Sequence, residues 1–119
     1  MNKRRIGTES EIQAGKFLSD AGYNILENNF YSRFGEIDII AVKEQFICFI
    51  EVKYRKTKTH GDAESAISML KMKKICRTAE YYLYLNRKYD KYQMRFDVVA
   101  INGNDITLYE NAFPFVSFN

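Results

Sequence analysis

Three residues in the middle of the chain have types and spacing that could support metal-dependent chemistry on phosphates. Asp38 is followed, after twelve intervening residues, by Glu51-Val52-Lys53. Mg²⁺ binds a few carboxylate oxygens while keeping several waters, and it can polarise a phosphoryl oxygen and help to deprotonate water. Asp38 and Glu51 would be metal ligands, the Val52 carbonyl a further one, and Lys53 would hold the attacking water or offset phosphate charge. The alternative that needs no metal is a cross-strand Glu36–Lys53 ion pair with Asp38 solvated.

Two short segments rich in Ile, Val and Phe must position these residues. Glu36–Val42 and Phe46–Lys53 are predicted strands, joined at Lys43-Glu44-Gln45. A hairpin with a two- or four-residue loop makes residues whose numbers sum to 89 face each other, so Asp38 lies opposite Glu51. Carboxylates directly across a ladder repel, and a bound cation would turn that repulsion into a site. A slip of one residue would send the two carboxylates to opposite faces.

A predicted helix before the hairpin carries a third acidic candidate. The helix runs from about Thr8 to Ala21 and is closed by Gly22, with Glu11 at the edge of its apolar stripe. One interpretation is a capping box, in which Thr8 is the N-cap and Glu11 the third helical residue. The other is that Glu11 directs its carboxylate at the hairpin, and the spacing leaves both open.

The remaining pattern indicates a single α/β domain over residues 1–119. We expect an edge strand at Tyr23–Tyr31, a long helix from Asp62 or Ala63 to Asn86, and strands at Arg95–Ile101 and Ile106–Glu110. The order α-β-β-β-α-β-β predicts a mixed sheet of about five strands flanked by helices. Residues 1–6 are expected to form a flexible basic tail.

Basic residues are concentrated on one side of the candidate site in the sequence. Between Lys53 and Arg77 there are eight Lys or Arg against two acidic residues. A solvated helix face is the ordinary explanation, but a basic flank beside paired carboxylates favours a polyanion such as DNA. The candidate nucleic-acid-binding residues are Arg55, Lys56, Lys71, Lys74 and Arg77.

Composition indicates which cellular compartment to expect for the protein. Two cysteines, Cys48 and Cys76, do not form a disulfide framework, and no apolar run is long enough to span a membrane. The basic N-terminus is not followed by the apolar region of a signal peptide, so we expect a cytoplasmic protein without membrane contact. Tyrosines near positions 81–92 are expected to pack or to mediate self-association, which leaves a homodimer open.

Several segments together resemble the YraN family of small bacterial proteins. The matching pieces span residues 7–113 and include Glu11-Ile-Gln-Ala14, Gly35-Glu-Ile-Asp38, Glu51-Val-Lys53, Lys71, Arg95-Phe-Asp97 and Asn111-Ala-Phe113. That family is similar to the PD-(D/E)xK nuclease-like group, which includes archaeal Holliday-junction resolvases. The resemblance implies a restriction-endonuclease-like core, with Asp38, Glu51 and Lys53 as the nuclease motif and Glu11 completing it.

The residues and the resemblance together predict a metal-dependent endonuclease-like protein. It would bind DNA, including branched or junction DNA, and hydrolyse phosphodiesters with Mg²⁺ or Mn²⁺. The rival hypothesis is a non-catalytic module that binds nucleic acid or a partner on the same fold. A third is a structural protein whose carboxylates are merely exposed.

Overall fold

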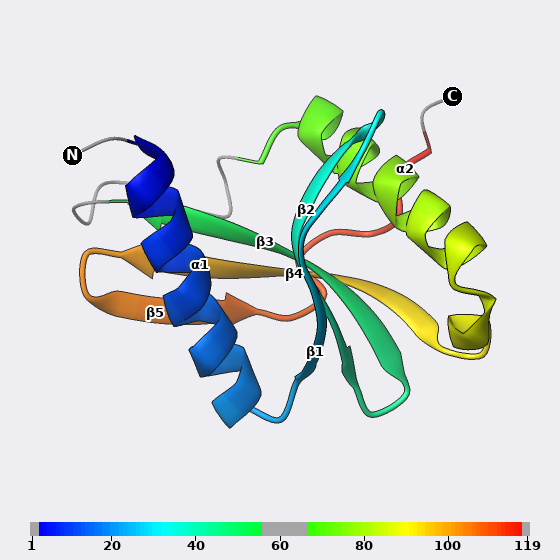
Figure 1. The fold of residues 1–119 in the computed structure, drawn as a ribbon. Helices are drawn as coiled ribbons and strands as arrows, with labels where there is room; N and C mark the ends of the chain where they lie inside the picture. Colours follow the sequence, from blue (N-terminus) through cyan, green and yellow to red (C-terminus); the bar gives the residue numbers. More distant parts are fainter. Residues whose placement is uncertain (1–2, 56–66, 118–119) are drawn as a thin grey trace.

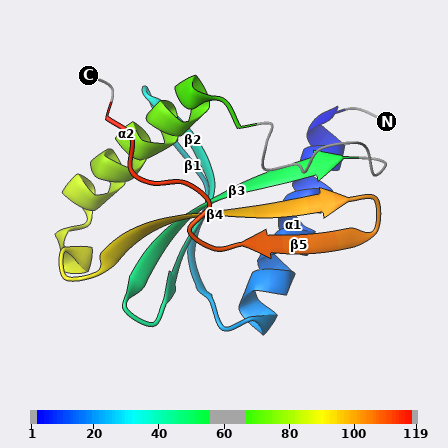
Figure 2. The same cartoon turned by 180° about the vertical axis from the view of Figure 1, so that it is seen from behind.

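The fold is a mixed sheet with two helices, as the computed structural model of residues 3–55 and 67–117 shows (Figures 1 and 2). Its elements are α1 (Lys3–Asp20), β1 (Asn24–Ser32), β2 (Gly35–Lys43), β3 (Phe46–Arg55), α2 (Met69–Leu85), the short 3-10 helix η2 (Arg87–Tyr89), β4 (Gln93–Asn102) and β5 (Asp105–Tyr109). The five strands lie in sequence order, with β3 and β4 parallel and all other neighbours antiparallel. The predicted α/β class and element order are confirmed.

The two helices cover opposite faces of the sheet. Alternate residues of β2 and β3 point to opposite sides, so Ile40 and Phe49 pack in the cluster under α2, whereas Ile39 and Ile50 pack in the cluster under α1. In Figure 1 α1 lies in front of the sheet, and in the reverse view of Figure 2 it lies behind. No helix in the described part of the chain is long and apolar enough to cross a membrane.

The central hairpin has the predicted register but separates into a fork. Its tight turn uses a left-handed backbone at Glu44, with φ 55°. Pairing runs from Lys43 opposite Phe46 to Ile39 opposite Ile50, and every pair sums to 89 as expected. Beyond that last pair, β2 stays with β1 and β3 stays with β4, so the two strands diverge (Figure 1). Asp38 and Glu51 are the first residues past the point of separation.

Both helices begin at different residues from those predicted. α1 begins at Lys3. Thr8 therefore lies inside the helix and not at its N-cap position, and the expected basic tail of residues 1–6 is helical from Lys3 on. The predicted start of the second helix at Asp62 or Ala63 is also wrong: residues 62–66 lie outside the described residues, and 67–68 are not helical. Ser68 is the N-cap instead, because its hydroxyl accepts a hydrogen bond from the Lys71 amide at 3.1 Å.

A buried acidic residue away from the fork ties three segments together. Asp97 on β4 is fully buried and accepts hydrogen bonds from the Tyr23 hydroxyl, from Nε and Nη2 of Arg95, and from the Asn111 amide, at 2.8–2.9 Å. These partners lie between α1 and β1, on β4 itself, and after β5. The carboxylate thus holds the end of α1 against the β4–β5 side of the sheet.

Candidate functional site

The two central carboxyl groups meet where β2 and β3 separate. Asp38 and Glu51 are 8% and 5% exposed, and their carboxyl groups adjoin each other. Oδ2 of Asp38 also accepts a hydrogen bond of 2.8 Å from the Val52 amide. This bond satisfies a strand amide at the position where the β2–β3 ladder has ended. The predicted convergence of Asp38 and Glu51 is therefore observed, while their roles as ligands stay a prediction.

The environment of the pair favours the neutral form of Asp38. Burial is the largest cause, and together with the adjoining Glu51 carboxyl it raises the pKa of Asp38 well above its usual range; the Val52 amide opposes the shift. Without a compensating cation, two buried carboxylates in contact cannot both be ionised cheaply. A divalent cation would remove that cost, so the donor chemistry of the pair fits one.

Two lysines reach Glu51 from different elements. Nζ of Lys53 lies 3.7 Å and Nζ of Lys71 lies 3.4 Å from Oε2 of Glu51. Lys53 shares a face of β3 with Glu51 because it is two residues further along the strand. Lys71 comes from the first turn of α2, whose start is set by the Ser68 cap. The sequence placed Lys71 among the nucleic-acid-binding residues, whereas in the structure it adjoins the carboxyl pair.

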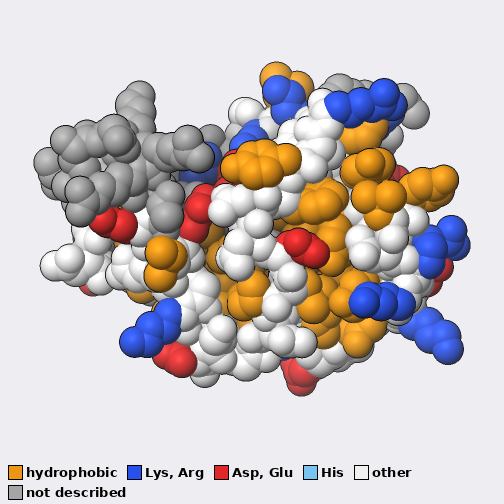
Figure 3. Space-filling model, in the orientation of Figure 1, with side chains coloured by type: hydrophobic (Ala, Val, Ile, Leu, Met, Phe, Trp, Pro, Cys, Tyr) orange, Lys and Arg blue, Asp and Glu red, His pale blue; other side chains and the backbone are white. Residues whose placement is uncertain are grey.

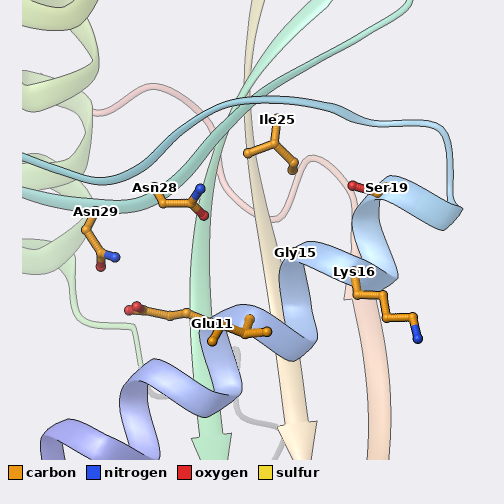
Figure 4. A pocket seen from close by; sticks show the side chains of 8 residues that line it. Glu11, Gly15, Lys16, Ser19, Ile25, Asn28 and Asn29 are labelled. Atoms are coloured by element: carbon orange, nitrogen blue, oxygen red, sulfur yellow. The ribbon is translucent and has the colours of Figure 1, made fainter.

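Glu11 borders this pair from α1. Its carboxyl lies near the side chains of Asn29 and Asp38; burial raises its pKa, and the charges of Glu36 and Glu51 add to the effect. Figure 4 shows Glu11 extending from α1 toward the β1 strand that carries Asn29. The interpretation that Glu11 points at the hairpin thus describes its position better than the capping box does.

A pocket of about 350 Å³ opens beside Glu11, between α1 and β1 (Figure 4). It is lined by Glu11, Ile12, Gly15, Lys16, Ser19, Ile25, Asn28 and Asn29. At Gly15 a side-chain carbon would meet no atom within 4 Å, so the missing side chain leaves open space there. The wall of this pocket combines the apolar side chains of Ile12 and Ile25 with polar groups, one of which is the Glu11 carboxyl.

The predicted metal site is best supported at the Asp38–Glu51 pair. Within residues 3–55 and 67–117, no group of three or more His, Cys, Asp or Glu side chains is arranged to hold a metal ion. Mg²⁺ nevertheless often rests on one or two carboxylates, with waters and substrate phosphate completing its shell. The pair therefore suffices chemically, and Glu11 remains a predicted third ligand.

The other predicted nucleic-acid-binding residues lie on two sides of the fork. Arg55 is exposed at the end of β3, whereas Lys74 and Arg77 are exposed on α2 (Figure 1). The Arg77 guanidinium lies 4.6 Å from the centre of the Phe34 ring. Lys56 lies outside the described residues. The exposed cations are thus distributed around the carboxyl pair.

Comparisons with known proteins show the relationships of the chain. Residues 10–101 match the model of a family described as "Uncharacterised protein family UPF0102". The chain is 43% identical over 113 residues to a UPF0102 protein of Lachnoclostridium phytofermentans, covering 95% of this chain and 96% of that protein. It is 43% identical over 111 residues to one of Fusobacterium nucleatum, covering 93% and 92%. With a UPF0102 protein of Francisella tularensis it shares 42% over 114 residues, covering 95% and 97%. The chain therefore belongs to the UPF0102 family, in agreement with its resemblance to YraN.

Proposed function

We propose that this protein is a metal-dependent nuclease-like protein that binds DNA and hydrolyses its phosphodiester bonds. The observation that carries the proposal is the buried Asp38–Glu51 pair at the strand fork, with the ammonium groups of Lys53 and Lys71 beside it. Charged groups are rarely buried together unless they are paired or bind a cation, and perturbed carboxyl groups of this kind gather at functional sites. The nuclease-like resemblance of the sequence supports the same chemistry.

Each residue of the cluster would have a separate task. Asp38 and Glu51 would hold Mg²⁺ or Mn²⁺, with Glu11 as a further ligand. A bound cation of this kind polarises a phosphoryl oxygen and lowers the pKa of water. Lys53 would hold the attacking water or offset charge on the phosphate, and Lys71 would add a second positive charge at the same place.

One observation favours the non-catalytic alternative on the same fold. Glu51 already has two ammonium partners, so the cluster balances part of its own charge. A module that only binds nucleic acid, or a partner, could use these lysines without turnover. Activity measurements separate the two hypotheses, because only the nuclease requires a cation and the ionised form of Asp38.

The experiment that tests the proposal is a cleavage panel of linear duplex, branched, single-stranded and RNA substrates with Mg²⁺ or Mn²⁺. We expect cleavage of at least one DNA substrate by the wild-type protein, and none by Asp38→Asn. Asp90→Asn is the matched control, because Asp90 forms an exposed ion pair with Arg87 on the η2 segment and should not affect cleavage. No cation-dependent cleavage of any substrate, with DNA binding retained, would favour the binding module.

A further inference from the structure

A second pocket lies at the tip of the β1–β2 hairpin, where it meets α2. It has a volume of about 360 Å³ and is lined by Tyr31, Ser32, Arg33, Phe34 and Tyr81. Tyr31 is 69% exposed and Tyr81 is 37% exposed, and the rings of Phe34 and Tyr81 meet edge to face with centres 6.0 Å apart. The size is within the usual range for ligand pockets, roughly 300–1,000 Å³.

Two guanidinium groups lie over the ring of Phe34, one of the aromatic side chains that line this pocket. The Cζ atom of Arg33 is 5.0 Å and that of Arg77 is 4.6 Å from the centre of the Phe34 ring. In Figure 3, Lys and Arg side chains border hydrophobic ones where the hairpin tip meets α2. Aromatic faces combined with fixed positive charge match a ligand that is flat and apolar in one part and anionic in another.

Two elements lead from this pocket to the carboxyl pair: β2, which begins directly after Phe34, and α2, which contributes Tyr81 to the pocket. Along β2, Gly35 at the hairpin tip is three residues from Asp38. Along α2, Lys71 beside Glu51 is followed at helical spacing by Lys74 and Arg77, and a rise of 1.5 Å per residue places Lys71 and Arg77 about 9 Å apart along the axis. The hairpin tip lies against α2: a side-chain carbon on Gly35 would be in ordinary van der Waals contact with Cβ of Lys74, at 3.4 Å.

We propose that this pocket takes an unpaired base of a single-stranded segment of nucleic acid, next to the phosphodiester held at Asp38 and Glu51. A base can stack on the exposed ring of Tyr81, next to the Phe34 ring that the two guanidinium groups lie over, and every base has a face suited to this. Arg33 and Arg77 would bind the flanking phosphates, with Lys74 continuing the contact toward the carboxyl pair. The inference rests on the proposed function and narrows its substrate to nucleic acid with unpaired bases near the cut. The sequence led us to expect that Tyr81 only packs or mediates self-association. In the structure it lines a pocket beside the guanidinium groups of Arg33 and Arg77.

The test compares two short single strands that carry the same charge. One is a labelled oligothymidylate, and the other is the same oligomer with abasic sites in place of every thymidine. Binding is measured by fluorescence anisotropy in EDTA, so that neither a cation nor turnover is needed. We expect the wild-type protein to prefer the oligothymidylate by roughly five- to 150-fold for one stacked base. Tyr81→Leu should lower that preference without changing affinity for the abasic strand, and Phe34→Leu, which removes the ring that Tyr81 packs against, should lower the preference too.

Tyr84→Leu is the matched control, because Tyr84 is also on α2 and 71% exposed but does not line the pocket. Its preference for the base-containing strand should equal that of the wild type. Equal binding of both strands by the wild-type protein would overturn the inference and leave the nuclease proposal standing. Binding of neither strand at low salt would also overturn the inference, whereas the nuclease proposal stands or falls with the cleavage panel. If Phe34→Leu changes only the sedimentation of the protein and not base preference, the pocket is a contact between copies and the inference is wrong.

Discussion

At the residue scale, the Asp38 side chain has a structural role and, in the proposed function, a chemical one. One carboxyl oxygen accepts the Val52 amide at the fork, and the group also contacts Glu51. Alanine at this position would remove the charge and leave that amide without its acceptor, at a cost of about 1–3 kcal/mol. Asparagine keeps an acceptor oxygen and removes only the ionisable group, so Asp38→Asn isolates the chemical task.

Lys53 is expected to act on the reaction rather than on cation binding. Lys53→Met should retain stabilisation by Mg²⁺ or Mn²⁺ but slow cleavage by roughly 100-fold or more, because it removes positive charge next to the reacting phosphate. Thermal melts and single-turnover cleavage measure the two effects separately. Lys91→Met, a change at an exposed lysine before β4, is the control and should match wild type in both. A Lys53→Met protein that cleaves at the wild-type rate would remove Lys53 from the site.

At the scale of elements, the site depends on how the hairpin tip is held against α2. Ser32 at the end of β1 and the buried Thr78 of α2 have hydroxyl oxygens 3.3 Å apart, and the Thr78 hydroxyl donates to the Lys74 carbonyl. The φ of 155° at Gly35 favours glycine there, and a side-chain carbon at this position would be in ordinary van der Waals contact with Lys74. These contacts place α2 so that Lys71 reaches Glu51.

The hydrogen bonds that Asp97 accepts from Tyr23, Arg95 and Asn111 should contribute most of the stability where the C-terminal end of α1 meets β4. Asp97→Ala leaves Arg95, which is 11% exposed, without its main partner, so the free energy of unfolding should fall by about 3–5 kcal/mol. Urea denaturation measures this change. The matched variant Asp90→Ala breaks an exposed pair whose side chains are 70% and 47% exposed, and should cost about 0–1 kcal/mol. Equal losses for the two variants would contradict a structural role for the network.

At the scale of the whole molecule, exposed cations rather than net charge should control DNA binding. The net charge is only +3, but Lys74 and Arg77 extend along α2 from the carboxyl pair. Replacing both with alanine should weaken binding and reduce the slope of log K against log salt by about 0.7–0.9 for each lost phosphate contact. Anisotropy titrations at several salt concentrations measure the slope. An unchanged slope would place the polyanion-binding surface elsewhere.

The β2–β3 register and the shared face of Glu51 and Lys53 depend only on local backbone geometry, so both could be predicted from the sequence. A tight turn and a period of two residues determine the β2–β3 register, and the same period brings Glu51 and Lys53 to one face. The contact of Lys71 with Glu51 depends on how α2 docks, which no spacing expresses. The pocket at Phe34 and the Asp97 network likewise join residues that are distant in the sequence. The Ser68 cap was missed because apolar periodicity continues upstream of the true helix start.

The central claim is that Asp38 and Glu51 form a site for a divalent cation. A cation that binds only the native state stabilises it by RT ln(1 + [L]/Kd), about 2.7 kcal/mol at a hundredfold excess over Kd. The direct measurement is the thermal midpoint of wild type and Asp38→Asn in EDTA and in millimolar Mg²⁺ or Mn²⁺. We predict that the cation raises the midpoint of the wild type only, and that in EDTA Asp38→Asn melts at the same temperature or higher, because it removes a buried carboxyl from contact with Glu51. A wild-type midpoint that neither ion shifts, or an equal shift in Asp38→Asn, would contradict the account.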